Sequence, residues 1–138
     1  MSASLLLLVA VPIGIALWAV KFGGRLPKGL RARSCQGAGW RSAFPSASKQ
    51  QIREFLSLFV SAFAFNESER LKLSPSDRPL QIYRGLYPYR WQPDALEFEA
   101  LTRDLQNRYA LNLAAVWRES LTLGELFAQA LNAEARTQ

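Results

Sequence analysis

The fold is decided by residues 94–131, which read DALEFEALTRDLQNRYALNLAAVWRESLTLGELFAQAL. Apolar side chains recur three and four positions apart in both halves of this stretch, the spacing that gathers them on one face of an α-helix. Each half also has a start signal, because Asp94 is followed by Glu97 and Thr122 by Glu125 in the capping-box pattern. We therefore predict two amphipathic helices joined by a short crossing.

An earlier helix is predicted over residues 49–65. Ser48 precedes it with Gln51 three positions on, which is again a capping box. Its apolar stripe has full helical spacing and consists of Ile52, Phe55, Leu56, Phe59, Val60 and Phe63. Residues 66–93 then form a long connection with four prolines, which exclude a continuous helix but leave room for a short turn around 78–84.

The N-terminal residues 2–20 carry no charged side chain. As a helix they would extend roughly 28 Å, close to the thickness of a bilayer core. A cleaved signal peptide or a buried core helix are the alternatives, but a signal peptide has its positive charges before the apolar run, whereas here they follow it. We predict a transmembrane helix over residues 1–21, in a bacterial inner (plasma) membrane, with the N-terminus outside and the rest of the chain in the cytoplasm.

The next segment, residues 22–47, is rich in Gly, Ser, Arg and Pro and has no helical periodicity, so we predict a basic juxtamembrane linker. Its cations are expected to lie against the anionic headgroups of the lipid bilayer. Those assigned to the membrane surface are Lys21, Arg25, Lys28, Arg31 and Arg33. Cys35, the one cysteine, is interpreted as an incidental thiol, with palmitoylation as the alternative.

The net charge of +6 is distributed unevenly. Residues 1–53 contain eight of the 17 basic residues and none of the 11 acidic ones, so the remaining residues have a net charge of 9 − 11 = −2. The basic character therefore belongs to the membrane-proximal segment and not to the helical domain. This distribution argues against nucleic acid as a partner.

A cluster of aromatic and basic residues near the second predicted helix is typical of protein interfaces. Its alternative role is to pack the long connection against its own helices. The residues predicted to bind a protein partner in a membrane complex are Arg84, Tyr87, Tyr89, Arg90, Trp91 and Phe98.

No residue pattern indicates catalysis. The chain has no histidine, no glycine-rich phosphate loop and no paired metal ligands. Glu97 and Glu99 are two positions apart on a predicted helix, so they point in different directions and cannot act as a catalytic pair. We predict that the chain is not an enzyme and has no catalytic, metal-binding or cofactor-binding residue.

The order of helix, long connection, helix, short crossing and helix resembles the acyl carrier protein family over about residues 48–132. Asp94-Ala95-Leu96 is similar to the family's Asp-Ser-Leu opening, and the segment from Leu121 to Leu126 resembles the turn into its last helix. In carriers the serine of that motif accepts the phosphopantetheine arm. Here the position is Ala95, which has no hydroxyl group, so the resemblance implies the helical fold and not the carrier chemistry.

These observations predict an all-α protein, with an N-terminal transmembrane helix followed by a small acyl-carrier-like bundle of three to four helices. The predicted boundaries are 1–21 for the span, 22–47 for the linker, 48–133 for the cytosolic bundle and 134–138 for a tail. The predicted function is a non-catalytic, membrane-anchored binding or scaffold subunit. The alternatives are a membrane-tethered carrier with an atypical attachment site, and an accessory subunit whose main contact is its transmembrane helix.

Overall fold

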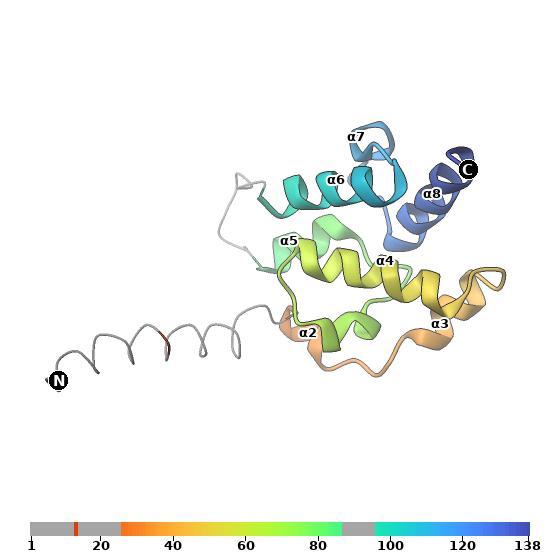
Figure 1. Ribbon diagram of the computed structural model, residues 1–138. Coiled ribbons are helices and arrows are strands. Elements are labelled where there is room, and N and C mark those ends of the chain that lie inside the picture. Colours follow the sequence, from red (N-terminus) through yellow and green to blue (C-terminus); the bar gives the residue numbers. More distant parts are fainter. Residues whose placement is uncertain (1–12, 14–25, 87–95) are drawn as a thin grey trace, which may run out of the picture.

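The computed structural model describes residue 13 and residues 26–86 and 96–138, and these residues form an all-α fold without a strand (Figure 1). The prediction of an all-α protein is confirmed. The elements are α2 (Lys28–Arg31), α3 (Gly37–Ala43), α4 (Lys49–Ala62), the 3-10 helix η1 (Glu67–Lys72), α5 (Pro79–Leu86), α6 (Leu96–Tyr109), α7 (Leu113–Val116) and α8 (Leu123–Arg136).

The predicted transmembrane helix, residues 1–21, lies outside the described residues except for Ile13. Within the part of the chain that the structure describes, no helix combines the length and apolar character required to cross a bilayer. The membrane span therefore stays a prediction.

Helix α4 is the central element of the domain (Figure 1). Its capping box forms as predicted, because the Ser48 hydroxyl accepts from the Gln51 amide at 3.1 Å and the Gln51 side chain accepts from the Ser48 amide at 2.8 Å. Its apolar stripe is buried, with Phe55 and Phe59 fully enclosed. This stripe packs against η1 on one side and α6 on the other, and α6 packs in turn against α8.

Two alanines in the left-handed region follow the ends of helices α4 and α6. Ala64 follows α4 and Ala110 follows α6, both with φ of 56°. In each case the next amide bonds back to a carbonyl near the helix end, Phe65 to Val60 at 2.7 Å and Leu111 to Leu105 at 3.3 Å. The bond from Phe65 is that of a Schellman motif, and the Ala110 amide makes the bond of the simpler αL motif to Gln106 at 3.0 Å. Both endings are usually built on glycine. Asn66, the first residue of the predicted connection, caps η1 by accepting from the Ser68 amide.

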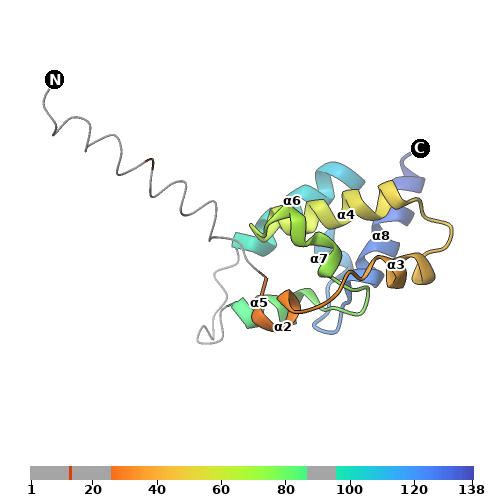
Figure 2. The same cartoon turned by 90° about the horizontal axis from the view of Figure 1, so that it is seen from below.

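Residues 26–44, which we name the strap, fold onto the helical domain instead of forming an extended linker. Figure 2 shows the strap running along one side of the molecule, from α2 beside α5 to α3 at the opposite end. Two of its side chains, Leu26 and Trp40, are 1% and 0% exposed. The Trp40 indole donates to the Leu73 carbonyl at 2.8 Å, and the Gln36 amide donates to the Leu71 carbonyl at 2.6 Å.

The difference from the expected linker has a physical reason. Helices α2 and α3 are only four and seven residues long, too short to show an apolar period. Their attachment depends on single anchoring side chains and on the carbonyl groups of Leu71 in η1 and of Leu73 just after it. The packed domain therefore begins before Ser48, the predicted boundary.

The C-terminal helix α8 extends to Arg136, further than the tail predicted from residue 134. Its N-cap is Thr122, whose hydroxyl accepts from the Glu125 amide at 3.1 Å. Its first amides bind the turn of residues 74–77: Leu123 donates to the Asp77 carbonyl and Gly124 to the Pro75 carbonyl, both at 2.8 Å. A Cβ at Gly124 would lie 3.0 Å from the Pro75 carbonyl oxygen, so any other residue would require the turn to move by a few tenths of an ångström.

Candidate functional site

A groove with an apolar floor lies where α5, α6 and α7 meet, and we name it the apolar groove. Its volume is about 610 Å³, and its lining residues are Leu80, Arg84, Phe98, Thr102, Leu113, Ala114, Trp117 and Glu119. The apolar part comes from all three helices, while Arg84 and Glu119 place opposite charges on its rim. Such a combination of apolar centre and polar edge is the common anatomy of a protein-binding surface.

Phe98 is the centre of the aromatic packing beneath the groove. Its ring lies 5.6 Å from Phe63 and 5.2 Å from Tyr83, and 5.1 Å from Trp117 in an edge-to-face arrangement. These contacts hold the ring half-buried and fix the floor of the groove. Phe98 departs from the apolar stripe of α6 because it packs toward Tyr83 of α5, Trp117 after α7 and Phe63 at the C-terminal end of α4.

The structure brings together two of the six predicted partner-binding residues, Arg84 and Phe98, in the apolar groove. The other four, Tyr87, Tyr89, Arg90 and Trp91, lie outside the described residues. Sequence reasoning missed Trp117 as a groove residue and assigned it only to the crossing between helices. The sequence did contain a signal for this role, because Trp117 follows a helix of only four residues, which is too short to bury a tryptophan side chain by itself.

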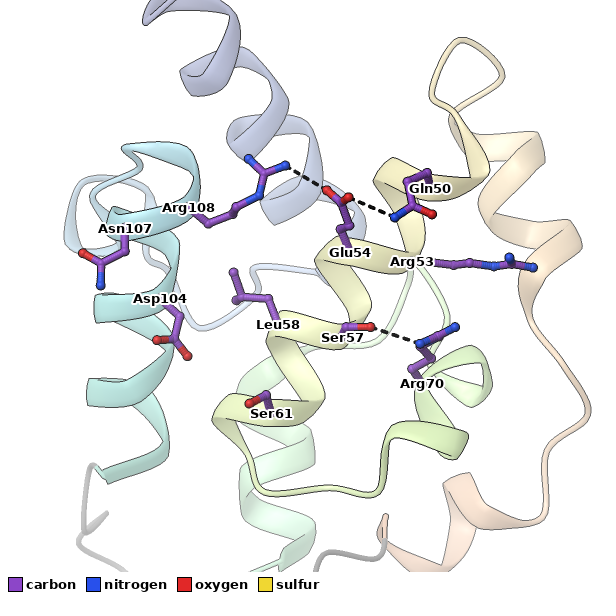
Figure 3. Close-up of a pocket in the computed structure, with 10 residues that line it drawn as sticks. All are labelled: Gln50, Arg53, Glu54, Ser57, Leu58, Ser61, Arg70, Asp104, Asn107 and Arg108. Carbon is purple, nitrogen blue, oxygen red and sulfur yellow. Dashed lines mark hydrogen bonds and ion pairs between the residues drawn. The ribbon is translucent and has the colours of Figure 1, made fainter.

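A second groove, charged and about 660 Å³ in volume, lies between α4 and α6 (Figure 3). Arg108 on α6 donates to Glu54 on α4 at 2.8 Å and to Glu134 on α8 at 2.9 Å. Gln50 donates to the same Glu54 carboxylate at 3.0 Å. One guanidinium therefore connects three helices across the surface of the domain.

The ionisation of these groups follows their hydrogen bonds. The bonds from Arg108 and then Gln50 lower the pKa of Glu54. The bonds to Glu134 and Glu54 raise the pKa of Arg108 further above its ordinary value. Glu54 and Arg108 therefore both stay charged at neutral pH, as a structural connection between helices requires.

The charged groove also contains a hydroxyl next to a carboxylate, the pair from which a nucleophile is sometimes built. Ser57 donates to Glu67, and Arg70 donates to both Ser57 and Glu67. The Ser57 hydroxyl lowers the pKa of Glu67, and Arg70 lowers it further. A carboxylate stabilised in its charged form is a poor general base. We therefore interpret this cluster as a connection between α4 and η1.

Replacing Arg108 with glutamine is expected to destabilise the domain in a pH-dependent way. Because the pKa of Glu54 is lower in the folded state, its ionised carboxylate stabilises the fold at pH values above the unfolded pKa of 4.5. This contribution is lost as the pH falls through the folded pKa. The variant lacks that contribution, so its deficit in unfolding free energy should be present at pH 7 and shrink below about pH 4.5. Urea denaturation followed by circular dichroism at several pH values measures the deficit.

The matched control is Arg103→Gln, on the same helix, because among the described residues the Arg103 guanidinium pairs with its neighbour Asp104 and not with another helix. This variant should follow the native pH profile. A deficit for Arg108→Gln that stays constant down to pH 3 would contradict the connection to Glu54.

The cations predicted for the membrane surface have different surroundings. Lys28 is exposed, whereas Arg33 forms an ion pair with Asp77 at 2.7 Å and Arg31 is half-buried. Lys21 and Arg25 lie outside the described residues. Arg33 is thus already engaged within the domain. No group of acidic or cysteine side chains in the described ranges is placed to hold a metal ion.

Comparison with known proteins gives one partial relationship. A stretch of 63 residues is 40% identical to the propanediol dehydratase small subunit of Citrobacter freundii, and it makes up 45% of this chain and 36% of that subunit. The chain thus spans about a third of the length of the curated relative it matches. No protein family model matches the chain, and no solved structure matches it. The resemblance to acyl carrier proteins therefore stays a prediction, and its motif residues Asp94 and Ala95 lie outside the described part. Over less than half of its length, this chain is similar to the small subunit of a dehydratase.

Proposed function

We propose that this chain is a non-catalytic binding subunit, held at a membrane by residues 1–21, which docks a protein partner in its apolar groove. The observation that carries the proposal is the groove itself, with an aromatic floor open to solvent between α5, α6 and α7. Half-buried Phe98 and Trp117 supply the large rigid contact surfaces that dominate binding energy at protein interfaces.

The partial relative supports the same class of function. That protein is by name the small subunit of a propanediol dehydratase, so it belongs to an assembly. We propose that this chain likewise contributes an accessory subunit to a larger complex.

The groove indicates the chemistry of the partner surface. Its floor suits two or three apolar side chains on one face of a helix, since helix-in-groove recognition uses anchors spaced by three and four residues. Arg84 at one edge favours an acidic residue on the partner, and Glu119 favours a basic one. This arrangement gives the partner helix a direction as well as a position.

The test is Ala114→Arg, which places a long charged side chain in the groove without removing a native contact of the core. Ala114 is exposed and lines the groove, so the fold should be retained. We expect co-purification of the partner with the full chain from detergent extracts to be lost. Once the partner is identified by mass spectrometry, its dissociation constant should rise at least about tenfold, or ~1.4 kcal/mol.

The matched control is Ala115→Arg, at the adjacent exposed position of α7, which does not line the groove. It adds the same charge and volume and should bind like the native chain. Equal binding by both variants would contradict the groove as the docking site, and equal loss would indicate a general effect of the added charge.

A further inference from the structure

A separate pocket of about 190 Å³ opens between the strap and α4, and we name it the basic pocket. Three cations line it: Arg41 from α3 and Lys49 and Arg53 from α4. Its floor is apolar and is formed by Ile52, which is 3% exposed, and by half-buried Leu71. The exposed thiol of Cys35 lies at its edge.

The three cations meet no carboxylate inside the basic pocket, although Arg53 also lines the charged groove, where Glu54 and Asp104 lie. No acidic residue lines the pocket, and all three side chains are exposed. The nearest carboxylate in sequence, Glu54, is engaged by Arg108 and Gln50 in the charged groove. Lys49 and Arg53 are also four residues apart on one helix, where like charges repel each other. A bound anion would remove this repulsion.

The position of the pocket indicates the source of that anion. The pocket lies at the α3 end of the strap, within the segment of residues 1–53 that contains no acidic residue. The strap runs along one side of the domain from α2 to α3 (Figure 2). In the sequence, these cations therefore belong to the same acid-free segment as the apolar residues 2–20.

We propose that the basic pocket binds the phosphate of an anionic phospholipid headgroup. The inference rests on the membrane placement in the proposed function and is independent of the apolar groove. Arg41 and Arg53 supply planar guanidinium groups that match phosphate oxygens in a forked geometry, and Lys49 adds a compact charge. The apolar floor contacts the carbon atoms of the headgroup. Bound in this way, the lipid fixes the domain on the membrane by one side and leaves the apolar groove free for its partner.

The test uses Cys35, the one cysteine of the chain, as a reporter at the edge of the pocket. The full chain is reconstituted into nanodiscs of phosphatidylcholine, or of phosphatidylcholine mixed with phosphatidylglycerol, and the rate of labelling by a neutral maleimide is measured. A headgroup in the pocket shields the thiol, so labelling should be about fivefold slower in the anionic discs. Because surface potential also affects thiols, the ratio of the two rates is compared between variants.

The double variant Lys49→Gln/Arg53→Gln should bring this ratio close to one. The control Arg78→Gln/Arg103→Gln removes the same net charge from exposed positions outside the basic pocket and should keep the native ratio. Equal ratios for native chain and pocket variant would overturn the proposal. Protection by inorganic phosphate in zwitterionic discs, without protection by phosphatidylglycerol, would overturn the lipid as the source.

Flotation with phosphatidylcholine vesicles separates this proposal from the proposed function, because it depends on residues 1–21 and not on the pocket. Absence of flotation would contradict membrane anchoring. Flotation combined with a labelling rate that is independent of phosphatidylglycerol would contradict the basic pocket alone.

Discussion

Replacing Trp40 with alanine is expected to lower the free energy of unfolding of the chain by about 4 kcal/mol. The ring is fully buried, and it lies 6.0 Å from Phe44, 6.3 Å from Phe55 and 5.8 Å from Phe127. The substitution removes these contacts and leaves a cavity where the strap meets α4 and α8. It also leaves the Leu73 carbonyl without the indole donor.

Urea denaturation of the full chain in a mild detergent, followed by far-ultraviolet circular dichroism, measures this loss. Trp40→Phe is the matched variant, because it keeps an aromatic ring and removes the N–H. It should cost about 1 to 3 kcal/mol, the range for leaving a buried acceptor unsatisfied. A loss below about 1 kcal/mol for Trp40→Ala, smaller than any core truncation of this size, would instead support an extended linker.

Raising the pH above 10 is expected to destabilise the domain through Tyr109. The phenol is on a buried face of α6, 3% exposed, and burial raises its pKa from 10.0 to about 12. Between about pH 10 and pH 12, the folded state therefore keeps the phenol proton that the unfolded chain loses. The stabilisation is complete below pH 10 and is lost as the pH rises through about 12. The resulting loss in the free energy of unfolding between pH 10 and pH 12 amounts to about 2 to 3 kcal/mol.

The measurement is the free energy of unfolding between pH 8 and pH 12, with Tyr109→Phe as the matched variant. Phenylalanine retains the ring that packs near Phe55 and under the Arg108 guanidinium, and it has no proton to lose. Its stability should resemble that of the native chain at pH 8 and exceed it at pH 12. Parallel pH profiles for the two proteins would show that Tyr109 ionises freely in the fold.

The helices that could be predicted are those with local signals. Ser48 and Thr122 act as caps because their partners lie three residues away in sequence, and the phenylalanine stripe of α4 repeats over four turns. The strap could not be predicted in this way. Trp40 is buried because the chain after η1 offers it a carbonyl group and α8 offers it Phe127, and both are distant in sequence.

In the candidate site, too, some residues could be predicted from local sequence signals and others could not. Composition alone indicated Arg84 and Phe98, because aromatic and basic residues gather near them. The rest of the apolar groove depends on α5 and α7, two helices of eight and four residues, meeting beside α6. Trp117 lines the groove because these three helices meet there, and its neighbours in the sequence do not indicate this. The basic pocket likewise combines residues of α3 and α4 with Leu71 of η1.

The turn of residues 74–77 affects how the chain is made. Its carbonyl groups accept the first amides of α8, while Asp77 pairs with Arg33 of the strap. Of the described helices, α8 is the last to leave the ribosome, so the strap, α4 and this turn are synthesised before their shared partner exists. The phenylalanine stripe therefore stays partly uncovered during translation, at ~5–20 residues per second. Only when α8 binds the turn and Phe127 packs against Trp40 is the core closed.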